Sequence, residues 1–217
     1  MDDGNRTGEI EWRDGAPVAT RFGDPYHAVG AGIDESRHVF LRGNGLPERL
    51  RDGFHVAELG FGTGRNALVT LAAWRGPGRI RYTAFEAWPM GRDDMARALT
   101  AMPGLDARPL LDAWPAEHVA LPGMNLRIVH GDARESLPRW EGRADAWYLD
   151  GFAPARNPEM WEPGLLAEVA RRTAPGGTFA TYTAAGHVRR ALEAAGFAVE
   201  RVAGFGRKRH MARGVLR

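Results

Sequence analysis

The sequence predicts an α/β fold built on a mostly parallel β-sheet, with a small N-terminal β appendage. Short apolar runs alternate with stretches of helical periodicity, which is typical of successive βαβ units. Many of these apolar runs end at an acid or at a glycine turn. A chain of 217 residues is also long enough to bury one substantial core. We therefore expect an appendage formed by residues 1–50 and one compact core unit formed by residues 51–217.

The appendage begins with a pattern typical of a hairpin. The stretches 9–12 and 18–22 are rich in apolar residues and flank Asp14-Gly15, a dipeptide that favours a tight turn. The chain that follows is rich in Gly and His, and it predicts irregular structure packed beside the sheet.

Helices and strands alternate through the core unit. β-branched and aromatic residues favour the strands, and Gly or Pro marks the ends of several helices, as at 76–78, 103–104 and Gly196. In chain order we expect strand 54–59, helix 66–74, strand 80–85, helix 93–102, strand 126–130, strand 144–149, helix 165–172, strand 177–183, helix 185–195, strand 197–202 and strand 209–215.

The composition excludes several classes of protein. Hydrophobic residues make up 44% and charged residues 26%, which are values of ordinary globular proteins. Apolar runs stay below the roughly 18 residues that a spanning helix needs, and the acidic start is unlike a signal peptide. A cytoplasmic protein without a membrane partner is expected. The absence of cysteine and of metal-ligand spacing among the histidines predicts no metal site.

A glycine-rich turn, 58–64, separates the first core strand from the first core helix. Glycines permit positive φ and close approach of a ligand, and the helix N-terminus offers unpaired N–H groups. Gly62 and Gly64 also satisfy the loose dinucleotide pattern, so the glycines alone leave NAD and FAD open. Glu58 argues against a pyrophosphate, because an acid there can bind an amino-acid ammonium directly or through water. S-adenosylmethionine carries such an ammonium and no phosphate.

Acids end four of the expected strands and predict a ligand site along one sheet edge. Glu86 lies 22 residues beyond Gly64, where a carboxylate can accept hydrogen bonds from ribose hydroxyls. Asp132 is placed for the adenine amino group, and Asp150 for the methyl position. Any one acid is equally explained as a helix cap or turn residue. The residues expected to bind the cofactor are Glu58, Gly60, Phe61, Gly62, Gly64, Asn66, Glu86, Asp132 and Asp150.

Two further stretches suggest contact with nucleic acid. In 150–161, two prolines stiffen a segment in which Phe152 and Trp161 can stack on a base, although core packing explains Trp161 equally well. The end of the chain, 201–217, holds five arginines and Lys208, the only lysine, without any acid. Such a segment can bind phosphates, and a solvated terminus explains the charges equally well.

These stretches resemble one known family. The chain is similar to the methyltransferase domain of the bacterial tRNA 5-methylaminomethyl-2-thiouridine biosynthesis protein MnmC in 9–12, 39–44, 58–64, 145–161, 181–186, 188–190 and 204–209. The resemblance implies a Rossmann-like class I S-adenosylmethionine-dependent methyltransferase. It also implies methylation of the exocyclic amine of 5-aminomethyl(-2-thio)uridine at the wobble position of the tRNA anticodon loop. Because the chain ends at Arg217, a stand-alone form or an excised domain without the FAD oxidase is expected, with a separate oxidase or other enzymes supplying the amine.

Methyl transfer to an amine is an in-line displacement, so catalysis is mostly alignment. We expect Asp150 to accept a hydrogen bond or a proton from the amine, whereas a turn cap is the structural alternative. The residues expected to contact the substrate are Tyr26, His27, Phe152, Arg156, Trp161, Arg207, Lys208 and Arg209. Departures from the family pattern at 24–28, Arg65 and His210 bear on the substrate more than on the cofactor. A methyltransferase acting on another amine, in a small molecule or a protein, and a non-catalytic RNA-binding module of the same fold remain alternatives.

Overall fold

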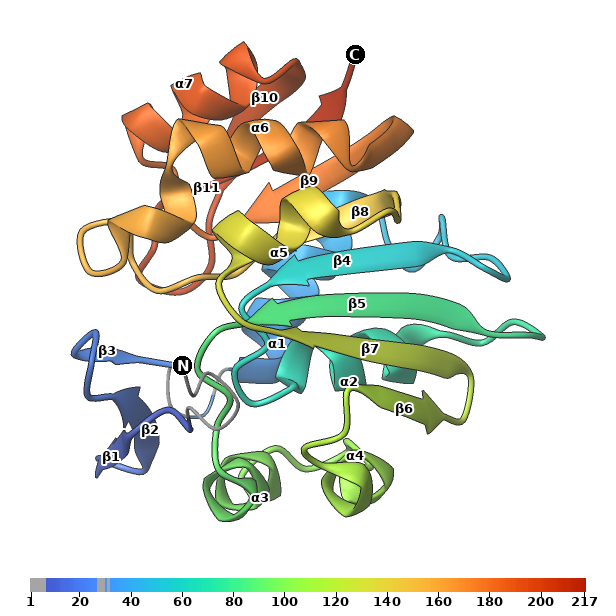
Figure 1. Cartoon of the computed structure of the whole chain (residues 1–217), viewed down its shortest axis with the longest axis vertical. Coiled ribbons are helices and arrows are strands. Elements are labelled where there is room, and N and C mark those ends of the chain that lie inside the picture. The colour runs from blue at the N-terminus through green and yellow to red at the C-terminus, as the bar shows by residue number, and fades with distance from the viewer. Residues whose placement is uncertain (1–6, 27–29, 31) are drawn as a thin grey trace.

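The computed structural model describes residues 7–26, 30 and 32–217. Its central feature is an eight-stranded sheet with helices on both faces (Figure 1). The strands are β4 (His55–Leu59), β5 (Ile80–Glu86), β6 (His118–Leu121), β7 (Met124–His130), β8 (Ala144–Leu149), β9 (Thr173–Thr181), β10 (Phe197–Ala203) and β11 (His210–Leu216). Their order in the sheet is β10-β11-β9-β8-β4-β5-β7-β6. Strands β9, β8, β4, β5 and β7 run parallel. Antiparallel pairing adds β6 at one end of the sheet, and β11 followed by β10 at the other. The predicted α/β class is confirmed.

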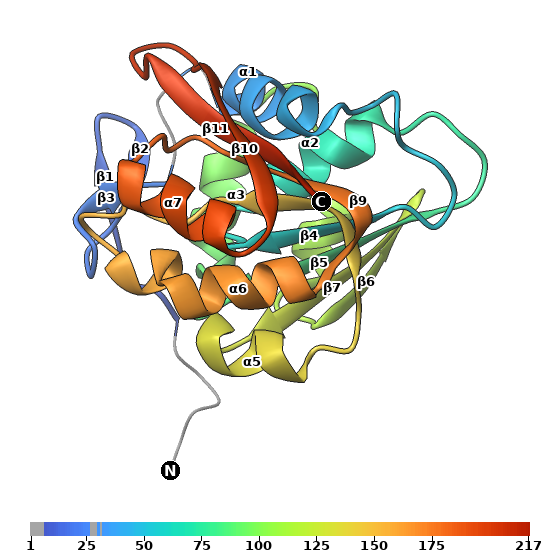
Figure 2. The same cartoon turned by 90° about the horizontal axis from the view of Figure 1, so that it is seen from above.

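Helices cover the sheet in two layers, and Figures 1 and 2 show α5, α6 and α7 on the face opposite to α1 and α2. The helices are α1 (Gly32–Ser36), α2 (Arg65–Ala73), α3 (Arg92–Thr100), α4 (Arg108–Ala113), α5 (Ala133–Arg139), α6 (Pro163–Arg171) and α7 (Gly186–Ala194), with a π-helical segment η1 (Arg37–Leu41) and 3₁₀ segments η2 (Arg42–Asn44) and η3 (Pro158–Trp161). Within the described residues, no helix is long and apolar enough to cross a membrane.

Each face of the sheet has its own hydrophobic cluster, because successive strand residues point to opposite faces. In β8, Ala146 and Tyr148 join the cluster beneath α2, and Trp147 and Leu149 join the cluster beneath α6 and α7. All four are at most 1% exposed. A strand with both faces buried reads as a continuous apolar run, which is why its bounds could be predicted from the sequence.

Every strand and helix predicted from the core sequence is present, with shifts of up to four residues at the ends. The structure adds β6, α4 and α5, which the sequence pattern did not indicate. These elements are four to seven residues long, so they give little periodicity. Helix α5 also carries Pro138 in its interior, a residue that normally argues against a helix.

The N-terminal hairpin is confirmed. Strands β1 (Ile10–Arg13) and β2 (Ala16–Ala19) pair around Asp14 and Gly15, and β3 (Asp24–Pro25) completes a separate three-stranded sheet. Both turn residues have positive φ, 49° and 81°, as a two-residue hairpin turn requires.

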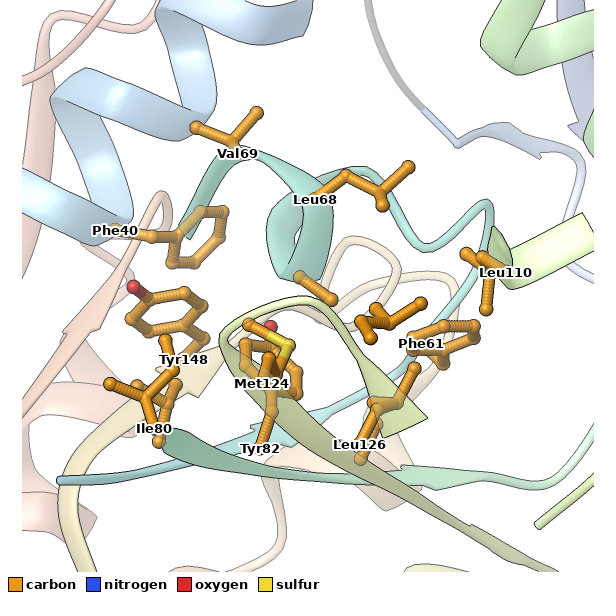
Figure 3. Packing of buried hydrophobic residues seen from close by; sticks show 14 of the residues in the cluster. Phe40, Phe61, Leu68, Val69, Ile80, Tyr82, Leu110, Met124, Leu126 and Tyr148 are labelled. Carbon is orange, nitrogen blue, oxygen red and sulfur yellow. The ribbon is translucent and has the colours of Figure 1, made fainter. Parts of the chain in front are cut away.

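Residues 32–44 were expected to be irregular, and that expectation is wrong. They are helical, and their apolar side chains enter the core beneath α2. Phe40 is 1% exposed and stacks on Tyr148 of β8 with 5.2 Å between ring centroids (Figure 3). This segment therefore helps to bury β8. The expected boundary between the appendage and the core unit at residue 50 stays a prediction.

Removing the Phe40 ring tests this packing. We expect Phe40→Ala to lower the free energy of unfolding by about 3–5 kcal/mol, because the substitution leaves a cavity against Tyr148. Val215→Ala is a control, since Val215 is 41% exposed. That change should stay within about 1 kcal/mol. Guanidinium denaturation measures both, and equal losses would show that the segment is not part of the core.

Candidate active site

A cavity of about 960 Å³ opens at the carboxyl ends of the parallel strands, where open α/β sheets bind their ligands. Its walls come from the loops after β4, β5, β7 and β8, from the N-terminal sheet and from the turn between β10 and β11. The structure thus brings together many of the residues predicted from the sequence. Those that line the cavity are Tyr26, Gly60, Phe61, Gly62, Asn66, Glu86, Asp132, Asp150, Phe152, Arg207 and Lys208. His27 lies outside the described residues.

The glycine turn after β4 passes very close to the turn after β8. Gly60 has φ +85°, and a Cβ added to it would lie 2.3 Å from the carbonyl oxygen of Asp150. Glu86 fixes the same turn from the end of β5. Its Oε2 accepts hydrogen bonds from the backbone N–H groups of Phe61 and Gly62, each at 2.9 Å. Its Oε1 accepts the N–H of Trp88 at 2.8 Å, and carboxylate oxygens have further lone pairs for a ligand.

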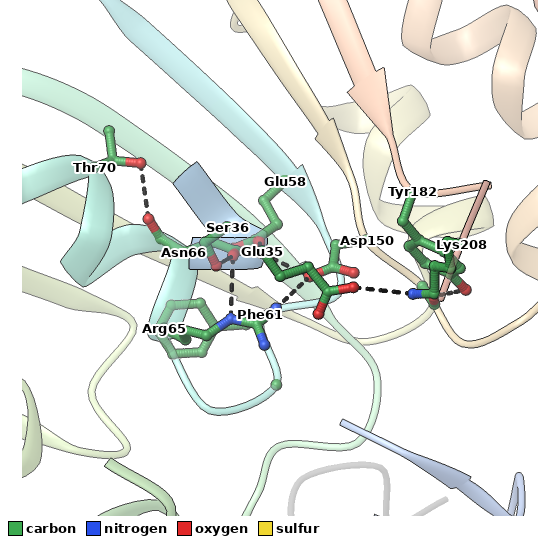
Figure 4. Close-up of polar contacts among 12 residues, drawn as sticks. Glu35, Ser36, Glu58, Phe61, Arg65, Asn66, Thr70, Asp150, Tyr182 and Lys208 are labelled. Atoms are coloured by element: carbon green, nitrogen blue, oxygen red, sulfur yellow. Dashed lines mark hydrogen bonds and ion pairs between the residues drawn. The ribbon is translucent and has the colours of Figure 1, made fainter. Parts of the chain in front are cut away.

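Asn66, in the first turn of α2, joins two carboxylates. Its amide nitrogen donates to Oε1 of Glu58 at 2.6 Å and to Oδ2 of Asp150 at 2.7 Å (Figure 4). Its amide oxygen accepts from the hydroxyl of Ser36 at 2.5 Å. Because an amide nitrogen carries two hydrogens, this side chain can satisfy both acids at once.

Glu58 lies behind the cavity wall rather than in it. It is 0% exposed, and Tyr82 donates its hydroxyl hydrogen to Oε2 at 2.8 Å. Both carboxylate oxygens are therefore occupied by protein donors. The sequence left open a direct or a water-mediated contact between Glu58 and a ligand ammonium. The direct contact is not supported by this geometry, in which Glu58 contacts Asn66 instead. Burial and the charge of Asp150 raise the pKa of Glu58 well above its usual range.

Asp150 directly follows β8 and lines the cavity with its side chain 21% exposed. A guanidinium nitrogen of Arg65, a side chain only 6% exposed, lies 3.5 Å from Oδ2. Burial raises the pKa of Asp150, while the positive charge of Arg65 and the hydrogen bond from Asn66 act in the opposite direction. Arg65 thus favours the ionised form of Asp150 at the cavity wall.

Asp132 is the N-cap of α5, accepting the backbone N–H of Arg134 at 2.8 Å. It also lines the cavity, and its binding of the adenine amino group stays a prediction. Its pairing with the guanidinium of Arg134 at 2.6 Å lowers the pKa of Asp132, mainly through the hydrogen bond.

Aromatic rings line one side of the cavity. Phe152 stacks on Phe22 with 4.7 Å between centroids and meets the ring of Tyr26 edge-on at 5.1 Å. Trp161 is different, because it is 3% exposed and packs in the core beneath α6. Its Nε1 donates to the carbonyl oxygen of Phe152 at 2.9 Å. The expected stacking of Trp161 on a substrate base is therefore replaced by support of the loop that carries Phe152.

The N-terminal sheet is attached to this loop. The carboxylate of Asp24 accepts the backbone N–H of Ala153 at 2.9 Å.

Of the predicted cationic residues, Arg207 and Lys208 line the cavity, while Arg156 and Arg209 are exposed beyond its lining. Gly64 lies behind the wall against Leu110 and the ring of Phe61.

Sequence reasoning missed several lining residues, including Phe22, Glu35, Arg65 and Tyr182. Arg65 had a usable signal, since it directly follows the glycine turn. Phe22 and Tyr182 lie in stretches that the sequence analysis singled out, but no local pattern assigned these side chains to the site, and only the folded chain places them in the same cavity as Asp150. In the part of the chain that the structure describes, no group of three or more His, Asp or Glu side chains could hold a metal ion.

A glycine turn after the first parallel strand, followed by acids at the next strand ends, is the arrangement of enzymes that bind a nucleoside-containing ligand. The family model for S-adenosyl-L-methionine-dependent methyltransferases matches residues 107–217. The chain belongs to this family, whose methyl donor is S-adenosylmethionine.

Individual proteins that are similar to this chain carry a more specific name than the family model. The chain is 46% identical over 219 residues to the tRNA 5-methylaminomethyl-2-thiouridine biosynthesis bifunctional protein MnmC of Aromatoleum aromaticum, covering 93% of this chain and 34% of that protein. It is 47% identical over 216 residues to the protein of the same name from Caulobacter vibrioides, covering 92% and 36%. The chain thus spans about a third of the length of these relatives. Among solved structures, MNMC2 from Aquifex aeolicus superposes with a TM-score of 0.77 at 26% identity, covering 100% of this chain and 72% of that one.

A matched pair of glycine substitutions tests whether the wall formed by the glycine turn after β4 binds the cofactor. Gly104 also has positive φ, +92°, but an added Cβ would meet no atom within 4 Å. Gly104→Ala should therefore show only backbone strain. We expect Gly60→Ala to displace the carbonyl of Asp150 as well, and to weaken binding of S-adenosylhomocysteine by roughly tenfold or more, or about 1.4 kcal/mol. Calorimetry measures this, and equal affinities in the two variants would contradict the assigned wall.

Proposed function

We propose that the protein methylates the exocyclic amine of 5-aminomethyl(-2-thio)uridine at the tRNA wobble position, giving 5-methylaminomethyl(-2-thio)uridine. The observation that carries this proposal is one cavity that combines a partly buried acid, an aromatic wall and a cationic rim, contributed by Asp150, Phe152 and Arg207. The printed name of the relatives, which concerns biosynthesis of this nucleoside, supports the choice of substrate.

The residues present fit S-adenosylmethionine by charge. Asp150, whose ionised form is favoured by Arg65 and Asn66, places negative charge beside the glycine turn, which suits the ammonium and sulfonium groups of this ligand. Nη1 of Arg65 is buried and has no hydrogen-bond partner among the residues that the structure describes, so a ligand carboxylate would satisfy it. Glu86 would hold the ribose hydroxyls, and Asp132 the adenine amino group, as the sequence predicted.

S-adenosylmethionine, when bound, supplies an electrophilic methyl group, and the protein aligns the amine with it. An alkylammonium has a pKa of roughly 10, so the amine must lose a proton before its lone pair can react. Asp150 would accept a hydrogen bond from the amine and orient the lone pair. As the nitrogen–carbon bond forms and the sulfur–carbon bond breaks, the excess proton on nitrogen would pass to Asp150 directly or through water.

The cavity mouth would hold the anticodon loop. A wobble base turned out of its stack would lie against Phe152 and Tyr26, because single-stranded bases are recognised by stacking. Arg207 and Lys208 would contact phosphates at the rim, with Arg156 and Arg209 further out. Such a substrate would place the protein in the cytoplasm. It would also require an oxidase, or other enzymes, to generate the aminomethyl group.

Transfer of a labelled methyl group tests the proposal. We expect incorporation from S-adenosylmethionine into tRNA that carries 5-aminomethyluridine, and none into tRNA that carries the carboxymethylated form. Asp150→Asn should lower the rate by roughly 10²–10⁴-fold, because it removes the proton acceptor. Asp106→Asn is the control, since Asp106 pairs with Arg108 at an exposed position. Donor binding without methylation of either tRNA would favour another amine as substrate, and no donor binding would favour an RNA-binding module.

The contact between Arg65 and Asp150 predicts a shift in pH dependence. Asp150 acts as the carboxylate, so activity rises with pH as this group loses its proton. Because the guanidinium lowers the pKa of Asp150, Arg65→Met should move the acidic limb of the rate profile to higher pH. The rate at saturating methyl donor, measured across pH, reports this shift. Arg92→Met, at an exposed position, should leave the limb in place, and an unmoved limb in Arg65→Met would exclude the coupling.

A further inference from the structure

The ammonium group of Lys208 occupies a site formed by a carboxylate and an aromatic ring. Its Nζ lies 3.1 Å from Oε1 of Glu35 and 3.8 Å from the centroid of the Tyr182 ring. Figure 4 shows Lys208 and Glu35 beside Asp150. These three residues and Tyr182 all line the active-site cavity. A carboxylate that faces an aromatic ring recognises alkylammonium groups, by ion pairing and by the attraction of a cation to the ring face.

The two sides of this contact differ in how firmly they are held. The Glu35 side chain is 12% exposed, and the next residue, Ser36, donates to Asn66 at 2.5 Å. Tyr182 donates its hydroxyl hydrogen to the carbonyl oxygen of Gly151 at 2.8 Å. By contrast, the Lys208 side chain is 47% exposed and sits on the turn between β10 and β11. The site for the ammonium group is therefore fixed, and Lys208 can leave it for solvent or for another partner.

The charges around the ring favour a cation there even without Lys208. Asp24, Glu35 and Asp150 lie close enough to raise the pKa of Tyr182 further, after burial, which is the largest cause. The phenol stays neutral, and its ring face and the Glu35 carboxylate are the two groups that contact the Lys208 ammonium. An aminomethyl group on a substrate base is the same chemical group as the end of a lysine side chain.

We propose that Glu35 and the ring face of Tyr182 form the subsite for the acceptor amine, and that Lys208 occupies this subsite until tRNA binds. This inference rests on the proposed function. When tRNA arrives, a backbone phosphate pairs with Lys208, and the substrate ammonium takes its place against Glu35, next to Asp150. A carboxymethylated amine would bring a carboxylate against these acids, so the subsite also selects for the free amine.

Equilibrium binding of two tRNAs, without methyl donor, tests the subsite. One tRNA carries 5-aminomethyluridine at the wobble position, and the other carries uridine. We expect the wild-type protein to bind the amine-bearing tRNA roughly tenfold or more tightly. In Glu35→Gln this ratio should fall towards one, while affinity for the uridine tRNA is retained. Tyr182→Leu should also lower the ratio, whereas Tyr182→Phe should keep it because the ring remains.

Lys208→Met distinguishes an amine subsite from an ion pair between Lys208 and Glu35 that only stabilises the fold. It should weaken binding of both tRNAs through the lost phosphate contact, with the ratio between them retained or increased because the competing ammonium is gone. Glu200→Gln, which removes an ion pair with Arg213 in the same terminal hairpin, is the matched control and should change neither value. Thermal unfolding of each variant checks that it is folded.

The outcomes are distinct from those that test the proposed function. If the wild-type protein methylates the amine-bearing tRNA but binds both tRNAs equally, or if folded Glu35→Gln keeps the wild-type ratio, the amine subsite is wrong and the methylation stands. If Glu35→Gln weakens both tRNAs equally, Glu35 is only a structural partner of Lys208, which also overturns the subsite. If the wild-type protein neither methylates nor discriminates, the proposed function itself fails.

Discussion

The side-chain amide of Asn66 is the constraint on which the active-site end of the molecule depends. It joins carboxylates at the ends of two adjacent strands, β4 and β8, and it does so from the first turn of α2. Leaving the buried Glu58 without this donor would cost about 1–3 kcal/mol or more. The helix must therefore start where the glycine turn delivers it, and the turn must pass beside the carbonyl of Asp150. Positive φ at Gly60 is a consequence of that path.

This constraint also explains how the cavity tolerates its charge. The chain is nearly neutral, with a formal net charge of +2, yet acids cluster at the carboxyl edge of the sheet. Part of this charge is compensated by Arg65, which lies beside Asp150, and by Lys208, which pairs with Glu35. The remainder is available for a ligand that carries positive charge. Negative charge inside and cations at the mouth suit a substrate whose reacting group is an amine and whose backbone is anionic.

Much of the fold and part of the site could be predicted from the sequence. The buried strands appear as apolar runs, and parallel connectivity brings their terminal acids, such as Glu86 and Asp132, to one edge. What could not be predicted depends on contacts between distant segments. Glu35 and Lys208 are 173 residues apart, and no local pattern links them. Trp161 was ambiguous for another reason, because a large aromatic ring satisfies a core and a binding surface equally well.

The position of β11 has a consequence for the order of folding during synthesis. Residues 210–216 form an interior strand that pairs with both β9 and β10, although they follow both in the chain. While the nascent chain emerges, β10 has no neighbour in the sheet and the turn that carries Lys208 has no anchor. The cavity is thus assembled only after these residues leave the ribosome, when a long-range strand insertion closes it. A prematurely terminated chain could hold the glycine turn and Asp150 and still lack the rim that admits the substrate.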